Sequence, residues 1–193
     1  MDKGIFHRKR KADNMVKLQD ILKKKRNQIL KDWFELAVNQ YPTDAKKFLV
    51  SVENRFANPI RASLLDGMNG LYDRLVAGET FETQDSCAFL DAVIRVRAVQ
   101  DLTAAQAIGF IFFLKDAVRA ALAGEIGRAG MLEELLTFES KIDNVALLAF
   151  NMFMQCREKI YELKATELRN RTSRILERAC RIWDAQERAP EER

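Results

Sequence analysis

Residues 55–75 read RFANPIRASLLDGMNGLYDRL, and this stretch shows where one central helix of the fold begins. Asn58 can cap that helix, because its side-chain oxygen can accept a hydrogen bond from an unpaired N–H of the first turn. Pro59 at the first helical position loses no hydrogen bond, since an N–H there would have no helical partner. Gly78 ends the helix. Apolar residues recur at helical spacing in between: Ile60, Leu64, Met68, Leu71, Tyr72 and Leu75.

The rest of the chain also has a helical pattern. No proline lies between Pro59 and Pro190, and alternating β-branched residues are sparse. We therefore predict an all-α fold. Besides the helix that begins at Pro59, we expect helices over residues 14–40, 83–100 and 131–188. Thr43 can cap a further helix that includes Val52. A Thr103/Gln106 capping box can open an apolar central helix from about 104 to 123.

The last of these helices is too long for an ordinary globular helix, so part of it must project or pair with a partner. After residue 163 its apolar residues follow a coiled-coil-like 4-3-4-3 spacing. The candidate interaction residues are Leu168, Ile175, Ala179 and Ile182, with Thr172 between them. We expect a basic flexible tail at 1–13, a helical domain at 14–165 and a helical extension at 166–193.

Charge is concentrated at the N-terminus, where residues 1–31 hold eleven Lys or Arg and three Asp. The simplest interpretation is a solvated tail and helix face. Binding to nucleic acid through HRKRK (7–11) and KKKR (23–26) is a weaker alternative, and its salt dependence would reveal it. The apolar runs are too short to span a bilayer and no signal peptide is evident, so we expect a cytoplasmic protein without membrane insertion.

Chemistry-bearing motifs are missing from the sequence. The single histidine, His7, lies in the basic tail, and no phosphate-binding glycine loop or paired-histidine metal motif occurs. Glu133 and Glu134 are interpreted as solvated carboxylates on a helix face. Cys87, Cys156 and Cys180 are interpreted as ordinary thiols, with Cys156 the candidate redox thiol because Arg157 is adjacent. We therefore expect no enzymatic activity, no metal and no cofactor.

Four stretches in order resemble the N-terminal sensor domain of RsbR/RsbRD-type proteins, the co-antagonists of a bacterial stress-response pathway. The stretches are ILKDWFELAVNQYPTDAKKFL (29–49), RFANPIRASLLDGMNGLYDRL (55–75), FLDAVIRVRAVQDLTAAQAIGFIFFLK (89–115) and MFMQCREKIYELKATELRNR (152–171).

The resemblance implies a single globin-like helical bundle without haem, a homodimer, and a C-terminal helix that leads to a STAS domain contacting a switch kinase. Only TSRILERACRIWDAQERAPEER follows Arg171, so we expect no STAS domain here, and kinase antagonism is not carried over. The matching positions have an expected structural role: Trp33, Tyr41, Pro42, Arg55, Phe56, Asn58 and Pro59. Phe56, Tyr72, Phe110 and Phe113 are expected in the core, with a small-molecule pocket as the alternative.

The sequence thus favours a dimeric, non-enzymatic sensory or regulatory module that signals through its last helix to an unidentified protein partner. That partner would be a signalling protein or a respiratory complex, in stress-response or respiratory and sulfur-metabolism regulation in bacteria. A structural adaptor or accessory subunit is the alternative, because it needs the same apolar stripe.

Overall fold

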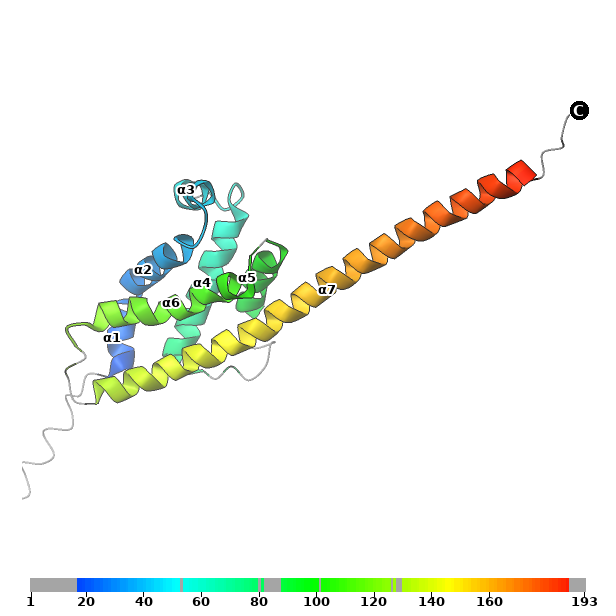
Figure 1. The fold of residues 1–193 in the computed structure, drawn as a ribbon. Helices are drawn as coiled ribbons and strands as arrows, with labels where there is room; N and C mark the ends of the chain where they lie inside the picture. Colours follow the sequence, from blue (N-terminus) through cyan, green and yellow to red (C-terminus); the bar gives the residue numbers. More distant parts are fainter. Residues whose placement is uncertain are drawn as a thin grey trace, which may run out of the picture. The chain divides into compact units, whose positions relative to one another are not determined.

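The described residues of the computed structural model are 17–52, 54–79, 81, 88–100, 102–125, 127 and 130–187, with side chains described as far as Trp183. They form seven helices and no strand (Figure 1). The helices are α1 (Leu18–Lys24), α2 (Arg26–Val38), α3 (Thr43–Ser51), α4 (Pro59–Ala77), α5 (Ala88–Val99), α6 (Ala104–Leu122) and α7 (Met131–Glu187). The predicted all-α class and long C-terminal helix are confirmed. The globin-like relationship stays a prediction.

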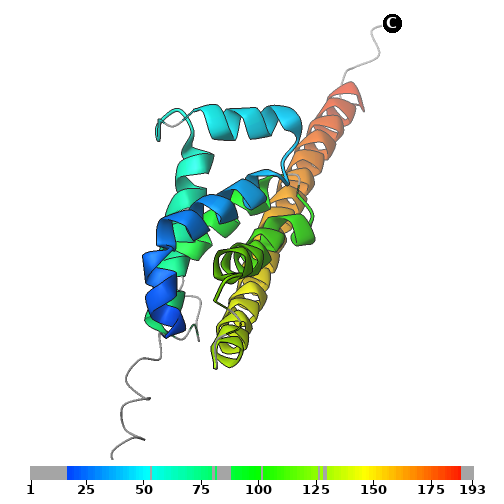
Figure 2. The same cartoon turned by 90° about the vertical axis from the view of Figure 1, so that its left-hand side faces the viewer.

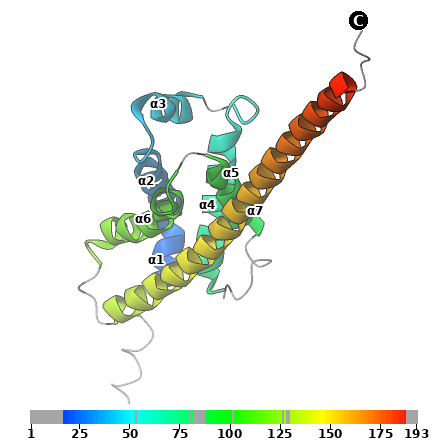
Figure 3. The ribbon, with the colours of Figure 1, turned by 45° about the vertical axis from the view of Figure 1, so that its right-hand side comes forward.

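The chain divides into two compact units, the first ending at Phe153 and the second beginning at Met154. The first unit holds α1 to α6 and the first part of α7, and it contains the hydrophobic core. The second unit is the rest of α7, which is one uninterrupted helix (Figure 3). None of the helices in the described residues combines the length and the apolar character needed to cross a bilayer.

The start of α4 is fixed by Asn58, which is only 1% exposed. Its Oδ1 accepts a hydrogen bond from the backbone N–H of Arg61 at 3.0 Å, as the sequence predicts. Its Nδ2 also donates to the backbone oxygens of Phe48 at 3.0 Å and Val52 at 3.2 Å. One amide therefore caps α4 and binds the end of α3, which connects α2 to α4 (Figure 2).

The pairing of α4 with α5 requires a residue without a side chain at position 67. A Cβ atom on Gly67 would overlap Cγ2 of Val93 and lie 3.1 Å from the backbone oxygen of Phe89. Gly78, with φ of +84°, ends α4 in the left-handed conformation that glycine adopts without strain.

The pairing of α2 with α6 centres on Trp33 and Phe110, whose rings stack with centroids 6.3 Å apart. Nε1 of Trp33 donates to the backbone oxygen of Phe110 at 2.6 Å, so the buried indole N–H is satisfied. The predicted capping box at the start of α6 is confirmed, because Thr103 and Gln106 each bind the other's backbone N–H.

Two sequence predictions about helix ends are wrong. The helix predicted over 14–40 is two helices among the described residues, with a break at Lys25. Nζ of Lys25 donates to the backbone oxygen of Ala121 at 2.6 Å, a tertiary contact at the end of α6 that the periodicity could not reveal. Thr43 does not cap α3. It is the first helical residue, after Pro42, and no side chain supplies a capping bond there.

The first part of α7 completes the core of the first unit. Its buried apolar residues are Met131, Leu135, Phe138, Ile142, Val145, Ala146, Ala149, Met152 and Phe153. An ion pair fixes the orientation of α7 against α6, because Arg119 of α6 donates two hydrogen bonds, of 2.7 and 2.6 Å, to the buried Glu139 of α7. The predicted helix after Gly130 is thus confirmed, and its first turns are an ordinary core helix.

We expect Asn58→Ala to lower the free energy of unfolding by about 2 kcal/mol or more, because it removes a cap and two buried hydrogen bonds. Thr103→Ala is the control, since it removes a cap at an exposed site and should cost about 1 kcal/mol. Urea unfolding followed by circular dichroism gives both values. Equal losses would contradict the second role of Asn58.

Candidate functional site

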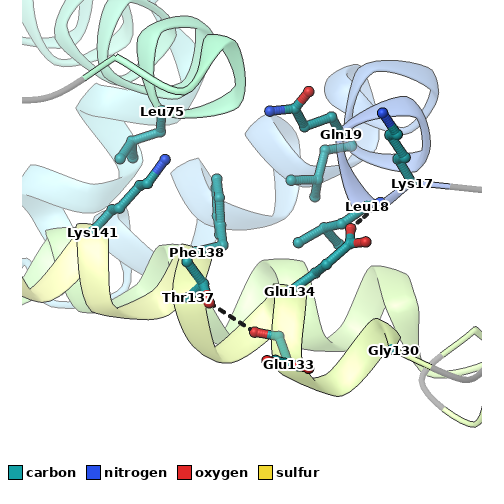
Figure 4. A pocket seen from close by; sticks show the side chains of 11 residues that line it. Lys17, Leu18, Gln19, Leu75, Gly130, Glu133, Glu134, Thr137, Phe138 and Lys141 are labelled. Carbon is teal, nitrogen blue, oxygen red and sulfur yellow. Dashed lines mark hydrogen bonds between the residues drawn. The ribbon is translucent and has the colours of Figure 1, made fainter.

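An open groove of about 530 Å³ lies in the first unit, bordered by α1, α4 and α7 (Figure 4). Leu18, Leu75 and Phe138 supply its apolar surface, and Lys17, Lys141, Glu133 and Glu134 supply charges of both signs. The backbone N–H of Leu18 donates to Oε2 of Glu134 at 2.7 Å. The N-cap residue Lys17 supplies no side-chain hydrogen bond to α1, whereas Glu134 accepts one from its first turn from α7.

This contact corrects the interpretation of the two glutamates. Glu133 is exposed, as expected, but Glu134 is half-buried and holds the first turn of α1. The hydroxyl of Thr137 donates to the backbone oxygen of Glu133 at 2.9 Å (Figure 4). Glu134 and Thr137 are therefore engaged in a helix cap and a local bond, and the described groove residues do not pair a nucleophile with a base.

A buried guanidinium is the polar centre of the first unit, and the sequence analysis missed it. Arg97 of α5 is 2% exposed. Its Nε donates to the backbone oxygen of Ala107 at 2.9 Å, and Nη2 donates to that of Gln106 at 2.8 Å. Nη1 donates to the hydroxyl of Tyr41 at 2.7 Å. The guanidinium carbon also lies 5.0 Å from the ring centroid of Phe110.

No carboxylate of the described residues pairs with Arg97, whose partners are neutral oxygens and aromatic rings. Burial disfavours the charged form of each group, so it lowers the pKa of Arg97 and raises the pKa of Tyr41. The positive charge of Arg97 opposes the rise in the pKa of Tyr41. A signal was present in the sequence. The buried face of α5 runs through Val93 and Ile94 to Arg97 and Ala98, so helical spacing places this arginine inside.

The structure distributes the residues of the family motif over several places. Trp33 is fully buried, Tyr41 binds Arg97, and Pro42 precedes α3. Asn58 and Pro59 begin α4. These positions have structural contacts, and their role in the family pattern stays a prediction.

Arg55 and Phe56 lie in the turn before α4. Arg55 forms an ion pair with Asp66 of α4. Phe56 is 98% exposed, so the expectation of a core side chain is wrong for it. The turn explains the difference, because Asn54 Oδ1 accepts from the backbone N–H of Phe56 at 2.9 Å and the chain faces solvent there. Both residues border a second open groove, of about 440 Å³, with Phe89 of α5.

The other candidate pocket residues lie in or near the core. Tyr72 and Phe110 are buried, and Phe113 is half-buried. The hydroxyl of Tyr72 donates to the backbone oxygen of Leu22 at 2.8 Å, and burial raises the pKa of Tyr72 well above its ordinary value. A small-molecule pocket around these rings stays a prediction.

The C-terminal candidates lie in the second unit, where Leu168, Ile175, Ala179 and Ile182 are all exposed. Cys156 is half-buried and Cys180 is exposed. The guanidinium of Arg157 donates to the hydroxyl of Tyr161 at 2.7 Å, and the redox role of Cys156 stays a prediction.

The basic tail with His7, and Cys87, lie outside the described residues. In the KKKR run, Lys25 and Arg26 have tertiary partners, Ala121 and Asp73.

The helices of the described residues define the class as an all-α domain. The family description "RsbT co-antagonist protein rsbRD N-terminal domain" matches residues 27–168. The chain belongs to this family of regulatory sensor domains of the stress-response partner-switching system, as the sequence resemblance indicated. Comparisons with curated proteins and with solved structures gave no significant match.

We expect Arg97→Met to lower the free energy of unfolding by about 3 kcal/mol, because it leaves Tyr41 and two backbone oxygens without their buried donor. Arg95→Met is the matched control on the same helix. Arg95 is exposed and forms a surface ion pair with Asp91, so its loss should cost about 0.5 kcal/mol. Similar costs for the two variants in urea unfolding would refute a central role for Arg97.

Stability should fall at alkaline pH through Tyr72. The folded chain keeps the phenol proton that the unfolded chain releases above about pH 10, so the free energy of unfolding decreases as pH rises further. Between about pH 8 and about pH 11, the free energy of unfolding of the wild type should fall by about 1 kcal/mol more than that of Tyr72→Phe. Urea unfolding at each pH measures both changes. Parallel pH profiles for the two proteins would show that Tyr72 is not responsible.

Proposed function

We propose that this chain is a non-enzymatic sensory or regulatory module that dimerises and signals through its C-terminal helix to a partner protein. Its membership in the rsbRD N-terminal family supports a regulatory role. In this proposal the first unit receives the change, and the second unit presents the surface that the partner contacts.

The observation that carries the proposal is the exposure of large apolar residues along the second unit. Leu168, Ile175 and Ile182 are between 54% and 66% exposed. Scattered surface leucines need no explanation, but these three recur at intervals of seven and so lie along one line of the helix. A partner helix would bury them together.

We further propose that a second copy contacts the first part of α7. Leu132, Leu136, Leu147 and Phe150 lie there and are between 44% and 67% exposed. The same helix face on two copies would form a self-complementary interface around a twofold axis. This arrangement leaves the second unit of each copy available for another protein.

The alternative is an adaptor or accessory subunit that senses nothing and only docks in a larger assembly. Native mass spectrometry of protein purified from its natural source separates the two. A reproducible bound small molecule, or association that changes with conditions, favours the sensor. Bare chains with constant association favour the adaptor.

We expect the wild-type chain to sediment as a dimer at micromolar concentration. Leu147→Lys with Phe150→Lys should weaken dimerisation by about tenfold or more, because two charges enter the proposed apolar contact. Ile175→Lys with Ile182→Lys is the control with the same change in charge and should remain dimeric. Sedimentation equilibrium measures all three. A monomeric wild type contradicts the dimer, and loss of the dimer only in the control places its contact in the second unit.

A further inference from the structure

The second unit carries a longer apolar line than the sequence analysis identified. Every seventh residue from Met154 to Ile182 is large, apolar and between 43% and 66% exposed. These residues are Met154, Tyr161, Leu168, Ile175 and Ile182. A strict seven-residue repeat of this kind keeps one line of a helix in contact with another helix that winds around it. We call these five residues the heptad line.

A line of cations runs beside the heptad line. Lys164, Arg171 and Arg178 each follow a heptad-line residue by three positions, which places them next to it on the same side of the helix. All three are exposed, and within the described residues none forms an ion pair. The small residues Ala165, Thr172 and Ala179 border the other side of the line.

Two cations away from the heptad line form ion pairs along the helix. Nζ of Lys159 lies 3.2 Å from a carboxylate oxygen of Glu162, and Arg181 lies 4.0 Å from Glu177. The cations that adjoin the apolar line thus form no ion pair along the described part of the helix, even though Glu167 lies three positions after Lys164 and four before Arg171, whereas these outer cations do form them. A partner that supplied carboxylates along the line would complete three ion pairs.

A second copy of this helix cannot supply them. In a parallel pair, heptad geometry sets Lys164 opposite Arg169 of the other copy, and it sets Arg171 and Arg178 opposite Leu176 and Trp183. In an antiparallel pair the two lines of cations face each other. Like charges therefore face each other along the antiparallel seam and at Lys164 and Arg169 of the parallel seam, which disfavours self-pairing.

We propose that the segment from Tyr161 to Trp183 binds an acidic amphipathic helix of another protein. That helix would cover the heptad line with apolar residues and place Glu or Asp opposite Lys164, Arg171 and Arg178. Only Leu176 and Trp183 add large exposed apolar residues beside the line, near its C-terminal end. This narrow apolar surface suits a helix better than the broad apolar face that membrane-surface helices use. The inference rests on the proposed role of the C-terminal helix as the signalling element.

The test uses the full chain and two fluorescent designed peptides of about four heptads. Both have leucine and isoleucine at the core positions; one has Glu at all flanking positions and the other has Lys. Fluorescence anisotropy should show that the Glu peptide binds at least about tenfold more tightly than the Lys peptide, and that its affinity falls as salt rises.

Two charge-reversal variants make the test specific. Lys164→Glu with Arg171→Glu and Arg178→Glu should reverse the preference between the peptides. Lys159→Glu with Arg174→Glu and Arg181→Glu changes the net charge equally but lies away from the line, so it should keep the wild-type preference. Circular dichroism of each full chain verifies that α7 still forms.

Equal effects of the two variants would overturn the inference, as would binding to phosphatidylserine vesicles without binding to the Glu peptide. Sedimentation of the same samples separates this inference from the proposed dimer. If the chain is a dimer but does not bind the Glu peptide, only the acidic partner is refuted. If the chain is a monomer and binds the Glu peptide, only the proposed dimer is refuted.

Discussion

The buried guanidinium of Arg97 is the interaction on which the first unit depends most. It comes from α5 and binds the first turn of α6 through the oxygens of Gln106 and Ala107, and it binds the chain after α2 through Tyr41. A buried cation without a carboxylate is costly unless every N–H finds an oxygen or a ring. Three segments must therefore meet in one geometry, and the Trp33–Phe110 stack between α2 and α6 lies beside it.

The junctions between helices depend on single polar side chains that act at a distance. Asn58 caps α4 and binds the end of α3, Glu134 caps α1 from α7, and Lys25 joins the α1–α2 break to the end of α6. Each satisfies backbone groups that a helix terminus leaves unpaired. The apolar stripes bring the helices together, and these polar contacts specify where each helix begins and ends.

The long helix α7 combines two kinds of surface. Through Phe153 it contributes apolar residues to a core, and from Met154 to Trp183 the described residues are exposed or half-buried. A helix whose apolar line has no cover within its own unit is suited to binding another molecule. In the proposed interaction, the cations beside that line, which form no ion pair among the described residues, favour a partner of opposite charge.

The sequence by itself determined the helical class, the start of α4 at Asn58-Pro59, the capping box of α6, the uninterrupted helix after Gly130 and the family. These features depend on residues close together in the chain, or on motifs in order, so local rules were sufficient. Only the tertiary structure decided the break at Lys25, the solvent exposure of Phe56, the cap supplied by Glu134 and the hydrogen bond from Arg97 to Tyr41. Lys25, Glu134 and Arg97 have partners more than a helical turn away in sequence, and Phe56 faces solvent because of the turn that holds it. Periodicity shows which face of a helix is buried, but not which distant oxygen or carboxylate that face will meet.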